Sequence, residues 1–122
     1  MNLKELAKTI DHTLLKPAAT TEQIDQICAE AREHDFASVC VNPCHVARCA
    51  EALKNAPDVA VCTVIGFPLG ANSTAVKVYE TLQATADGAT EVDMVINVGA
   101  IKSEDWQLVE ADVKRVVQAA HA

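Results

Sequence analysis

Strand-like alternation and helix-like periodicity take turns along the chain, and no linker or low-complexity segment interrupts them. Four runs indicate strands because they are rich in β-branched residues and bounded by proline, glycine or polar turns. These runs are residues 9–15, 37–41, 59–65 and 90–97. A helical pattern follows each of them, which is the repeat of parallel strands joined by right-handed crossovers.

The helical stretches are bounded by recognisable start and stop signals. Thr20 or Thr21 can cap a helix over residues 21–34, and Pro43 suits the first position of the next helix. Ser73 or Asn72 can cap a third, which ends at Gly88. This third helix carries the apolar positions Val76, Tyr79, Leu82 and Ala86. Short opening and long final helices are expected over residues 2–8 and 105–122.

Polar residues within the strands decide between two α/β architectures. An open doubly wound sheet has near-continuous apolar strands, whereas these strands alternate. In residues 90–97, the face that carries Val92 and Met94 is apolar, and the opposite face carries Glu91 and Asp93. A barrel explains this, because its apolar positions face the outer helices and its polar ones face the lumen. We therefore expect the parallel (β/α)4 half of a TIM-type (β/α)8 barrel, forming one domain over residues 1–122.

Composition narrows the function classes. The net charge of −7 argues against a nucleic-acid or anionic-membrane partner, because phosphates would be repelled. No run is long and apolar enough to span a bilayer, and the first residues do not resemble a signal peptide. An odd number of cysteines, five, without a secretory signal favours reduced thiols, so a cytoplasmic location is expected.

Asp93 is the sharpest candidate for chemistry. It lies in a strand between Val92 and Met94, where partial desolvation favours a raised pKa or a charged partner. Groups that transfer protons are prepared in this way. The alternative is a structural acid that holds a neighbouring cation, and the pattern alone leaves both interpretations open.

Other candidates have plainer alternatives. Asp11 and Thr13 share a face of the first strand, whereas His12 points to the opposite face and is better explained as packed under a helix. Cys40 lies on the lumen side of the second strand, although a small core residue is the commoner fate of cytosolic cysteine.

Two further motifs are weak. Cys40, Cys44, His45 and Cys49 lack a second paired ligand set, so zinc is disfavoured and we expect no metal. The loop at residues 66–70, GFPLG, lacks the spacing of a phosphate cradle. No lysine lies within an expected strand, although Lys16 and Lys102 lie just beyond strand ends, where barrel active sites are built.

Four segments, TIDHTLLKP, SVCVNP, TVIGFPLG and GATEVDMVINVGA, resemble in this order the N-terminal half of the deoxyribose-phosphate aldolases. The resemblance implies a (β/α)8 barrel that reversibly cleaves 2-deoxy-D-ribose 5-phosphate into glyceraldehyde 3-phosphate and acetaldehyde. It implies a lysine Schiff base as electron sink, and neither cofactor nor metal. By the same resemblance, Asp93 matches the aspartate of the proton relay, and Asp11, Thr13 and Cys40 match positions that support the pocket.

The resemblance also places essential groups elsewhere. It assigns the Schiff-base lysine to strand six, its partner lysine to strand seven and the phosphate-binding loops to the last strands. None of these falls in the 122 residues, so the chain alone is expected to be inactive or very weak. The alternative is a self-assembling half-barrel, a homodimer or larger homo-oligomer that closes eight strands. A small open-sheet binding domain of unrelated activity is a third interpretation.

Overall fold

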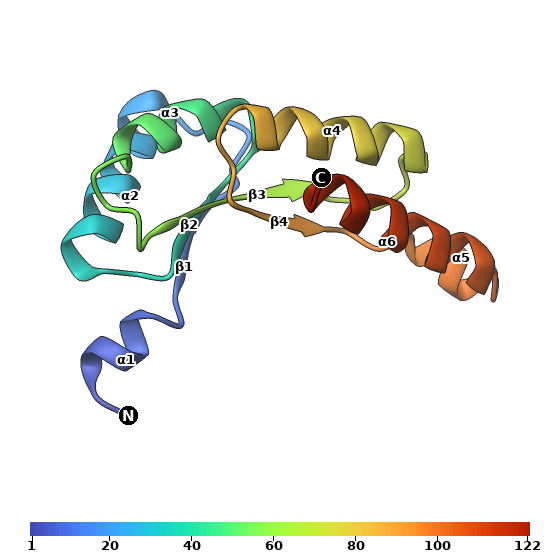
Figure 1. Ribbon diagram of the computed structural model, residues 1–122, viewed down its shortest axis with the longest axis horizontal. Helices are drawn as coiled ribbons and strands as arrows, with labels where there is room; N and C mark the ends of the chain where they lie inside the picture. The colour runs from blue at the N-terminus through green and yellow to red at the C-terminus, as the bar shows by residue number, and fades with distance from the viewer.

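A computed structural model describes residues 1–122. Its elements in chain order are α1 (Leu3–Ala7), β1 (Asp11–Leu14), α2 (Thr21–His34), β2 (Ser38–Val41), η1 (Pro43–His45), α3 (Val46–Ala52), β3 (Ala60–Ile65), α4 (Thr74–Ala86), β4 (Glu91–Met94), α5 (Val98–Lys102) and α6 (Trp106–Ala120). The four strands are all parallel, lie in the order β1-β2-β3-β4 and alternate with helices. Figure 1 shows the resulting twisted sheet, with α2, α3, α4 and α6 packed along it.

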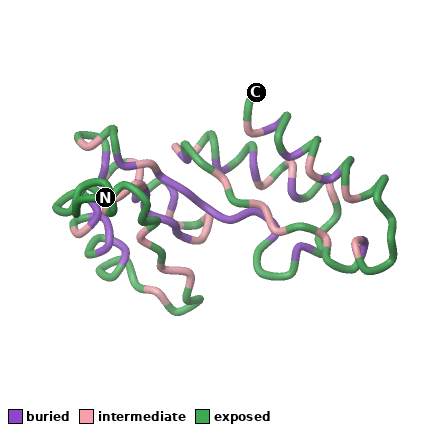
Figure 2. Tube along the Cα trace, turned by 90° about the horizontal axis from the view of Figure 1, so that it is seen from below, coloured by how far each residue is buried: buried purple, intermediate pink, exposed green.

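The two faces of the sheet have different environments. On one face, Val39, Val41, Val61 and Ile65 join buried residues of α2, α3, α4 and α6 in the main core. On the other face, a small cluster of Cys40, Cys62 and Val64 includes no buried helical residue. One face covered by helices and one left for a lumen is the arrangement of a half-barrel, as the alternation predicts. Figure 2 shows the buried positions running through the strands and the inner sides of the helices.

Side-chain caps fix where the helices begin. The Thr20 hydroxyl accepts from the Gln23 N–H at 3.2 Å, and Ser73 and Asp105 cap α4 and α6 in the same way. α2 ends at His34, because the next residue, Asp35, has a left-handed φ of 54° that breaks the helix. The bounds of α2 therefore agree with the sequence prediction, and Thr20 rather than Thr21 is its cap.

The apolar positions noted for α4 do not form its buried face. Val76, Tyr79 and Leu82 are 51%, 71% and 47% exposed. The buried side chains of this helix are Lys77, Thr81 and Ala84. The helix is rotated in this way because the Lys77 ammonium forms a buried ion pair with Asp112 of α6 at 2.6 Å. A polar contact has thus overridden the apolar periodicity.

One smaller prediction fails near β4. This strand ends at Met94, three residues before the expected end, and Val98 starts the short helix α5, which was not expected from the sequence. The Asn97 side chain accepts from the Ala100 N–H at 3.1 Å and so caps α5. A five-residue helix that contains Gly99 leaves little periodic signal in a sequence.

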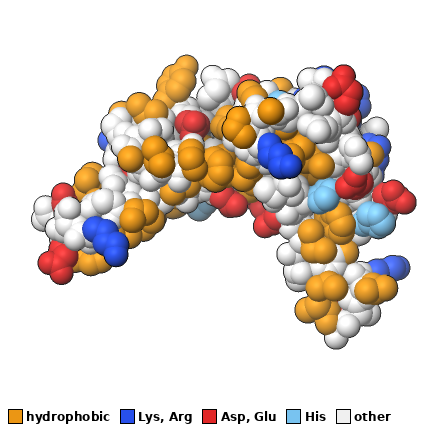
Figure 3. Space-filling model, turned by 180° about the vertical axis from the view of Figure 1, so that it is seen from behind, with side chains coloured by type: hydrophobic (Ala, Val, Ile, Leu, Met, Phe, Trp, Pro, Cys, Tyr) orange, Lys and Arg blue, Asp and Glu red, His pale blue; other side chains and the backbone are white.

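The N-terminal helix α1 lies apart from the core and has no buried residue. Figure 3 shows it projecting at the lower right with hydrophobic side chains on its surface. Leu3 and Leu6 are 83% and 47% exposed. None of the helices combines the length and the hydropathy that a membrane crossing requires.

Candidate active site

Strand register brings the polar positions of the sheet into adjacent rows on the lumen face. Thr13, Cys40, Cys62 and Glu91 occupy successive strands in one row. Asp93 lies two residues beyond Glu91 and is paired with Val64. In parallel barrels the carboxyl ends of the strands carry the active site, and Asp93 with Val64 lies nearer to that end than the row that ends at Glu91.

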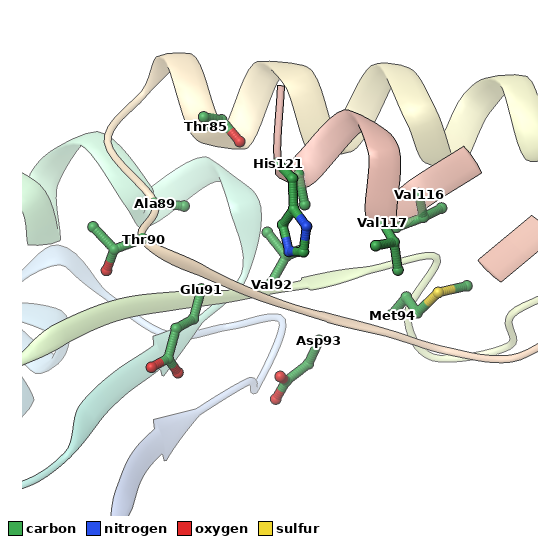
Figure 4. Close-up of a pocket in the computed structure, with 11 residues that line it drawn as sticks. Thr85, Ala89, Thr90, Glu91, Val92, Asp93, Met94, Val116, Val117 and His121 are labelled. Atoms are coloured by element: carbon green, nitrogen blue, oxygen red, sulfur yellow. The ribbon is translucent and has the colours of Figure 1, made fainter. Parts of the chain in front are cut away.

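Asp93 projects from the lumen face of β4. Figure 4 shows Glu91 and Asp93 directed to one side of this strand, away from Val117 of α6 and from His121, which follows that helix. The carboxylate is exposed, and it forms none of the ion pairs of the structure. The desolvation and charged partner expected from its neighbours are therefore absent here, because β4 is an edge strand with no strand beyond it.

Asp11 and Thr13 are held by local hydrogen bonds on β1. The Ser38 hydroxyl donates to Asp11 Oδ1 at 2.7 Å, which fixes this carboxylate toward β2. The Thr13 hydroxyl donates to the Asp11 carbonyl oxygen at 2.8 Å. The structure thus brings Asp11 next to a buried serine, a partner that the sequence alone could not pair with it.

Cys40 forms part of a pair of thiols. Cys40 and Cys62 are Cα partners on β2 and β3, and the two residues are 4% and 1% exposed. The hydrogen bond between the thiols lowers the pKa of Cys40, although burial and the acids Asp93, Asp11 and Glu91 oppose this shift. The same hydrogen bond, with burial, raises the pKa of Cys62.

Cys62 could not be identified from the sequence, because its pairing depends on strand register. Its Sγ, the Sγ of Cys40 and a carboxylate oxygen of Asp93 lie within 4.8 Å of one another. The cluster of Cys40, Cys44, His45 and Cys49 considered from the sequence is not assembled, because Cys49 is buried in the main core with Cys28 whereas Cys40 lies in the small cluster on the other face of the sheet. The sequence contains one signal for this pairing. Cys40 is the third residue of β2 and Cys62 is the third residue of β3.

His12 has the structural role that its alternation indicates. Its Nε2 lies 2.6 Å from Glu30 Oε2 of α2, and its ring centroid lies 5.1 Å from that of Phe36. The loop of residues 66–70 also has an internal partner, because the Gly66 N–H donates to Glu80 Oε1 at 2.7 Å. This backbone N–H already donates to a carboxylate, whereas in a phosphate-binding loop it would be free to donate to the phosphate.

The lysines do not converge on the lumen face. Lys77 is fully buried, and its Nζ donates to Asp112 at 2.6 Å and to the Val95 carbonyl oxygen at 3.1 Å. Lys16 and Lys102 are exposed, the first beyond β1 and the second at the end of α5. No lysine lies on a strand, as expected from the sequence.

A groove runs along the open edge of β4 beside the end of α6 (Figure 4). Its apolar wall includes Val92, Met94, Val116 and Val117, and Thr90 and His121 contribute polar groups. A further parallel strand would add at this edge, because its backbone groups have no partner strand.

These features define half of a parallel barrel whose lumen face carries carboxylates and thiols. The model of the DeoC/LacD family aldolases matches residues 6–122. The chain is 59% identical over 117 residues to deoxyribose-phosphate aldolase of Halalkalibacterium halodurans, covering 96% of this chain and 52% of that protein. It is 62% identical over 115 residues to that of Macrococcus caseolyticus, covering 94% of this chain and 52% of that protein.

Solved structures agree with this assignment. A structure from Coccidioides immitis, assigned to the same enzyme, has a TM-score of 0.95 and 41% identity, covering 99% of this chain and 47% of that one. The tetrameric deoxyribose-phosphate aldolase of Aeropyrum pernix has a TM-score of 0.88 and 32% identity, covering 98% of this chain and 49% of that one.

The chain belongs to the DeoC/LacD aldolase family. Within the family it matches the N-terminal half of deoxyribose-phosphate aldolase, and it spans about half the length of the curated relatives it matches.

Proposed function

We propose that this chain supplies the N-terminal half of an active site for reversible aldol cleavage of 2-deoxy-D-ribose 5-phosphate. The observation that carries the proposal is the placement of Asp93 on the lumen face, beside the Cys40–Cys62 pair. Asp93 transfers protons in the reaction, and Asp11, Thr13 and Cys40 shape the floor of the pocket. An exposed carboxylate with no ion-pair partner is free to exchange a proton with a bound group.

The nucleophile of this reaction comes from residues outside 1–122. Schiff-base chemistry needs an accessible lysine amine beside the substrate carbonyl. Lys77 cannot serve because its Nζ is buried and bonded to Asp112 and Val95. Lys16 and Lys102 are exposed, but Lys16 follows β1 and Lys102 ends α5, so neither residue belongs to the strand row that Cys40 and Cys62 form.

Barrel closure explains how the two halves would meet. The edges of β1 and β4 have no partner strand, and the groove beside β4 is lined by apolar side chains of β4 and α6. A second four-stranded unit that pairs with both edges would cover this groove and enclose Asp93. Enclosure would also supply the desolvation that raises a carboxyl pKa toward the range of a proton-transfer group.

Borohydride trapping tests whether the nucleophilic lysine lies outside these 122 residues. The 122-residue chain is incubated with acetaldehyde or with the sugar phosphate, reduced, and analysed by intact mass. We expect no stoichiometric lysine adduct and no turnover. A stoichiometric adduct with turnover would contradict the proposal, and Lys16→Ala and Lys102→Ala variants would then identify the nucleophile.

A second candidate is a self-assembling half-barrel with a structural role. The two unpaired edges favour it, because two copies related by a twofold axis could pair β4 of one with β1 of the other. We expect a homodimer or larger assembly in sedimentation at micromolar concentration. A clean monomer would rule out this candidate and leave the proposed aldolase half intact.

A further inference from the structure

The lumen face carries three ligand groups for a soft metal ion, and no step of the proposed reaction uses the two thiols among them as reacting groups. Sγ of Cys40, Sγ of Cys62 and a carboxylate oxygen of Asp93 lie within 4.8 Å of one another. In a tetrahedral zinc site, bonds of about 2.3 Å place neighbouring ligand atoms about 3.8 Å apart. The observed separations are therefore within about 1 Å of a coordinating arrangement.

The two kinds of ligand differ in mobility in a way that favours binding. Cys40 and Cys62 are buried and fixed by the register of β2 and β3, so the two sulfur atoms form a preset pair. Asp93 is exposed on the edge strand β4, where its side chain can rotate to meet an ion held by the thiols. Two fixed ligands and one adjustable ligand close a site at low conformational cost.

Charge around the thiols favours a cation over an anion. The carboxylates of Asp93, Asp11 and Glu91 all act electrostatically on the Cys40 thiol. These negative charges attract a divalent cation and repel an anion.

We propose that Cys40, Cys62 and Asp93 form a three-ligand site for a thiophilic divalent cation such as Zn²⁺ or Cd²⁺. Two sulfur ligands select these ions over Mg²⁺ and Ca²⁺, and a water molecule completes the tetrahedron. Each thiol that coordinates releases its proton to solvent, so no oxidant or reductant takes part. A consequence that rests on the proposed function is that a bound ion withdraws Asp93 from proton transfer and so inhibits cleavage.

The chain contains a matched control for this site. Cys28 and Cys49 form a second pair of buried cysteines, 1% and 0% exposed, in the core between α2 and α3. No carboxylate completes this pair, because the nearby Asp25 is held by the Arg48 guanidinium at 2.7 and 2.8 Å. Both sites therefore contain two buried cysteines, but only Cys40 and Cys62 have a carboxylate, that of Asp93, as a third ligand group.

Titration of the reduced 122-residue chain with Cd²⁺ alone tests the site through the ultraviolet thiolate-to-metal charge-transfer band. We expect one ion per chain, with Zn²⁺ displacing it in competition. Cys62→Ala should weaken binding at least about tenfold, and Asp93→Asn, at an exposed position, should weaken it without loss of fold. Cys28→Ala should leave affinity unchanged.

Two results would overturn the site: no charge-transfer band in the unchanged chain, or binding that survives Cys62→Ala and is lost in Cys28→Ala. Circular dichroism on each variant separates lost binding from lost folding. The inhibition is tested separately, in a mixture with the C-terminal half of a relative. Zn²⁺ should inhibit the mixture made with the Cys62→Ala variant at least about tenfold more weakly than the mixture made with the unchanged chain. This variant retains Asp93, so its proton-transfer group is unaltered. An inactive mixture would count against the proposed function, whereas the Cd²⁺ titration still decides the metal site.

Discussion

The Lys77 ammonium and the Asp112 carboxylate meet at 2.6 Å between α4 and α6, and both side chains are almost completely buried. The pair makes two further hydrogen bonds, because Thr74 donates to the second carboxylate oxygen at 2.8 Å and Lys77 donates to the Val95 carbonyl at 3.1 Å. This network joins both helices to the segment after β4. It therefore fixes the helix rotation that exposes Val76 and Tyr79.

Removal of one member of this pair should be strongly destabilising. Asp112→Ala leaves an uncompensated buried ammonium, and we expect a loss of about 3–5 kcal/mol in the free energy of unfolding. Urea denaturation followed by circular dichroism measures it. The exposed pair Glu51–Lys54 is the control, because Lys54→Ala should change stability by less than about 1 kcal/mol.

The double variant Lys77→Met with Asp112→Leu provides a second check. Replacing a buried ion pair by apolar residues of similar size is often neutral, so we expect most of the lost stability to return. A double variant as unstable as Asp112→Ala would show that the two helices need the polar contacts themselves.

The loop between β3 and α4 depends on glycine at position 70. Gly70 has a φ of +67°, and a Cβ there would lie 2.1 Å from the carbonyl oxygen of Ile96. Gly70→Ala should therefore cost at least about 2–3 kcal/mol, from left-handed strain and from a backbone clash. Thermal or urea unfolding measures this loss.

Gly99 is the matched control for that substitution. Its φ is not in the left-handed region, and the atom nearest to an added Cβ would be Oδ1 of Asn97, 3.6 Å away. Because Gly99 lies within α5, alanine should be neutral or stabilising by up to about 1 kcal/mol. Equal losses at positions 70 and 99 would refute the steric account of the loop.

The contact between β1 and α2 should make stability depend on pH. The hydrogen bond from His12 holds the pKa of Glu30 below its ordinary value of 4.5. A carboxyl group whose folded pKa is lowered adds stability above its unfolded pKa. That stability is lost as the pH falls through the folded pKa.

Glu30→Gln should therefore be less stable than the unchanged chain at neutral pH, and the difference should shrink as the pH falls below 4.5. Urea midpoints across this range measure the difference, and His12→Ala should return the pKa of Glu30, followed by NMR, toward its ordinary value. An identical pH dependence for both chains would mean that this contact does not form in solution.

Much of the fold follows from local patterns. The alternation of Glu91, Val92, Asp93 and Met94 predicts which side chains face the lumen, and Thr20 with residues 21–34 predicts α2. These predictions succeed because each depends on neighbours in the sequence.

The failures depend on distant residues. The burial of Lys77 rests on Asp112, which is 35 positions away, and the pairing of Cys40 with Cys62 rests on the register of two strands. The exposure of Asp93 rests on the lack of a strand beyond β4. The candidate site is predictable residue by residue, but its partners emerge only from the assembled sheet.

Complementation tests the central claim most directly. The 122-residue chain is mixed with the C-terminal half of a curated relative, and cleavage of 2-deoxy-D-ribose 5-phosphate is measured against each half alone. We expect activity only in the mixture, and Asp93→Asn should reduce it by about 10²–10⁴-fold while the two halves still associate. Full activity in the mixture that carries Asp93→Asn would contradict the assignment of proton transfer to this residue.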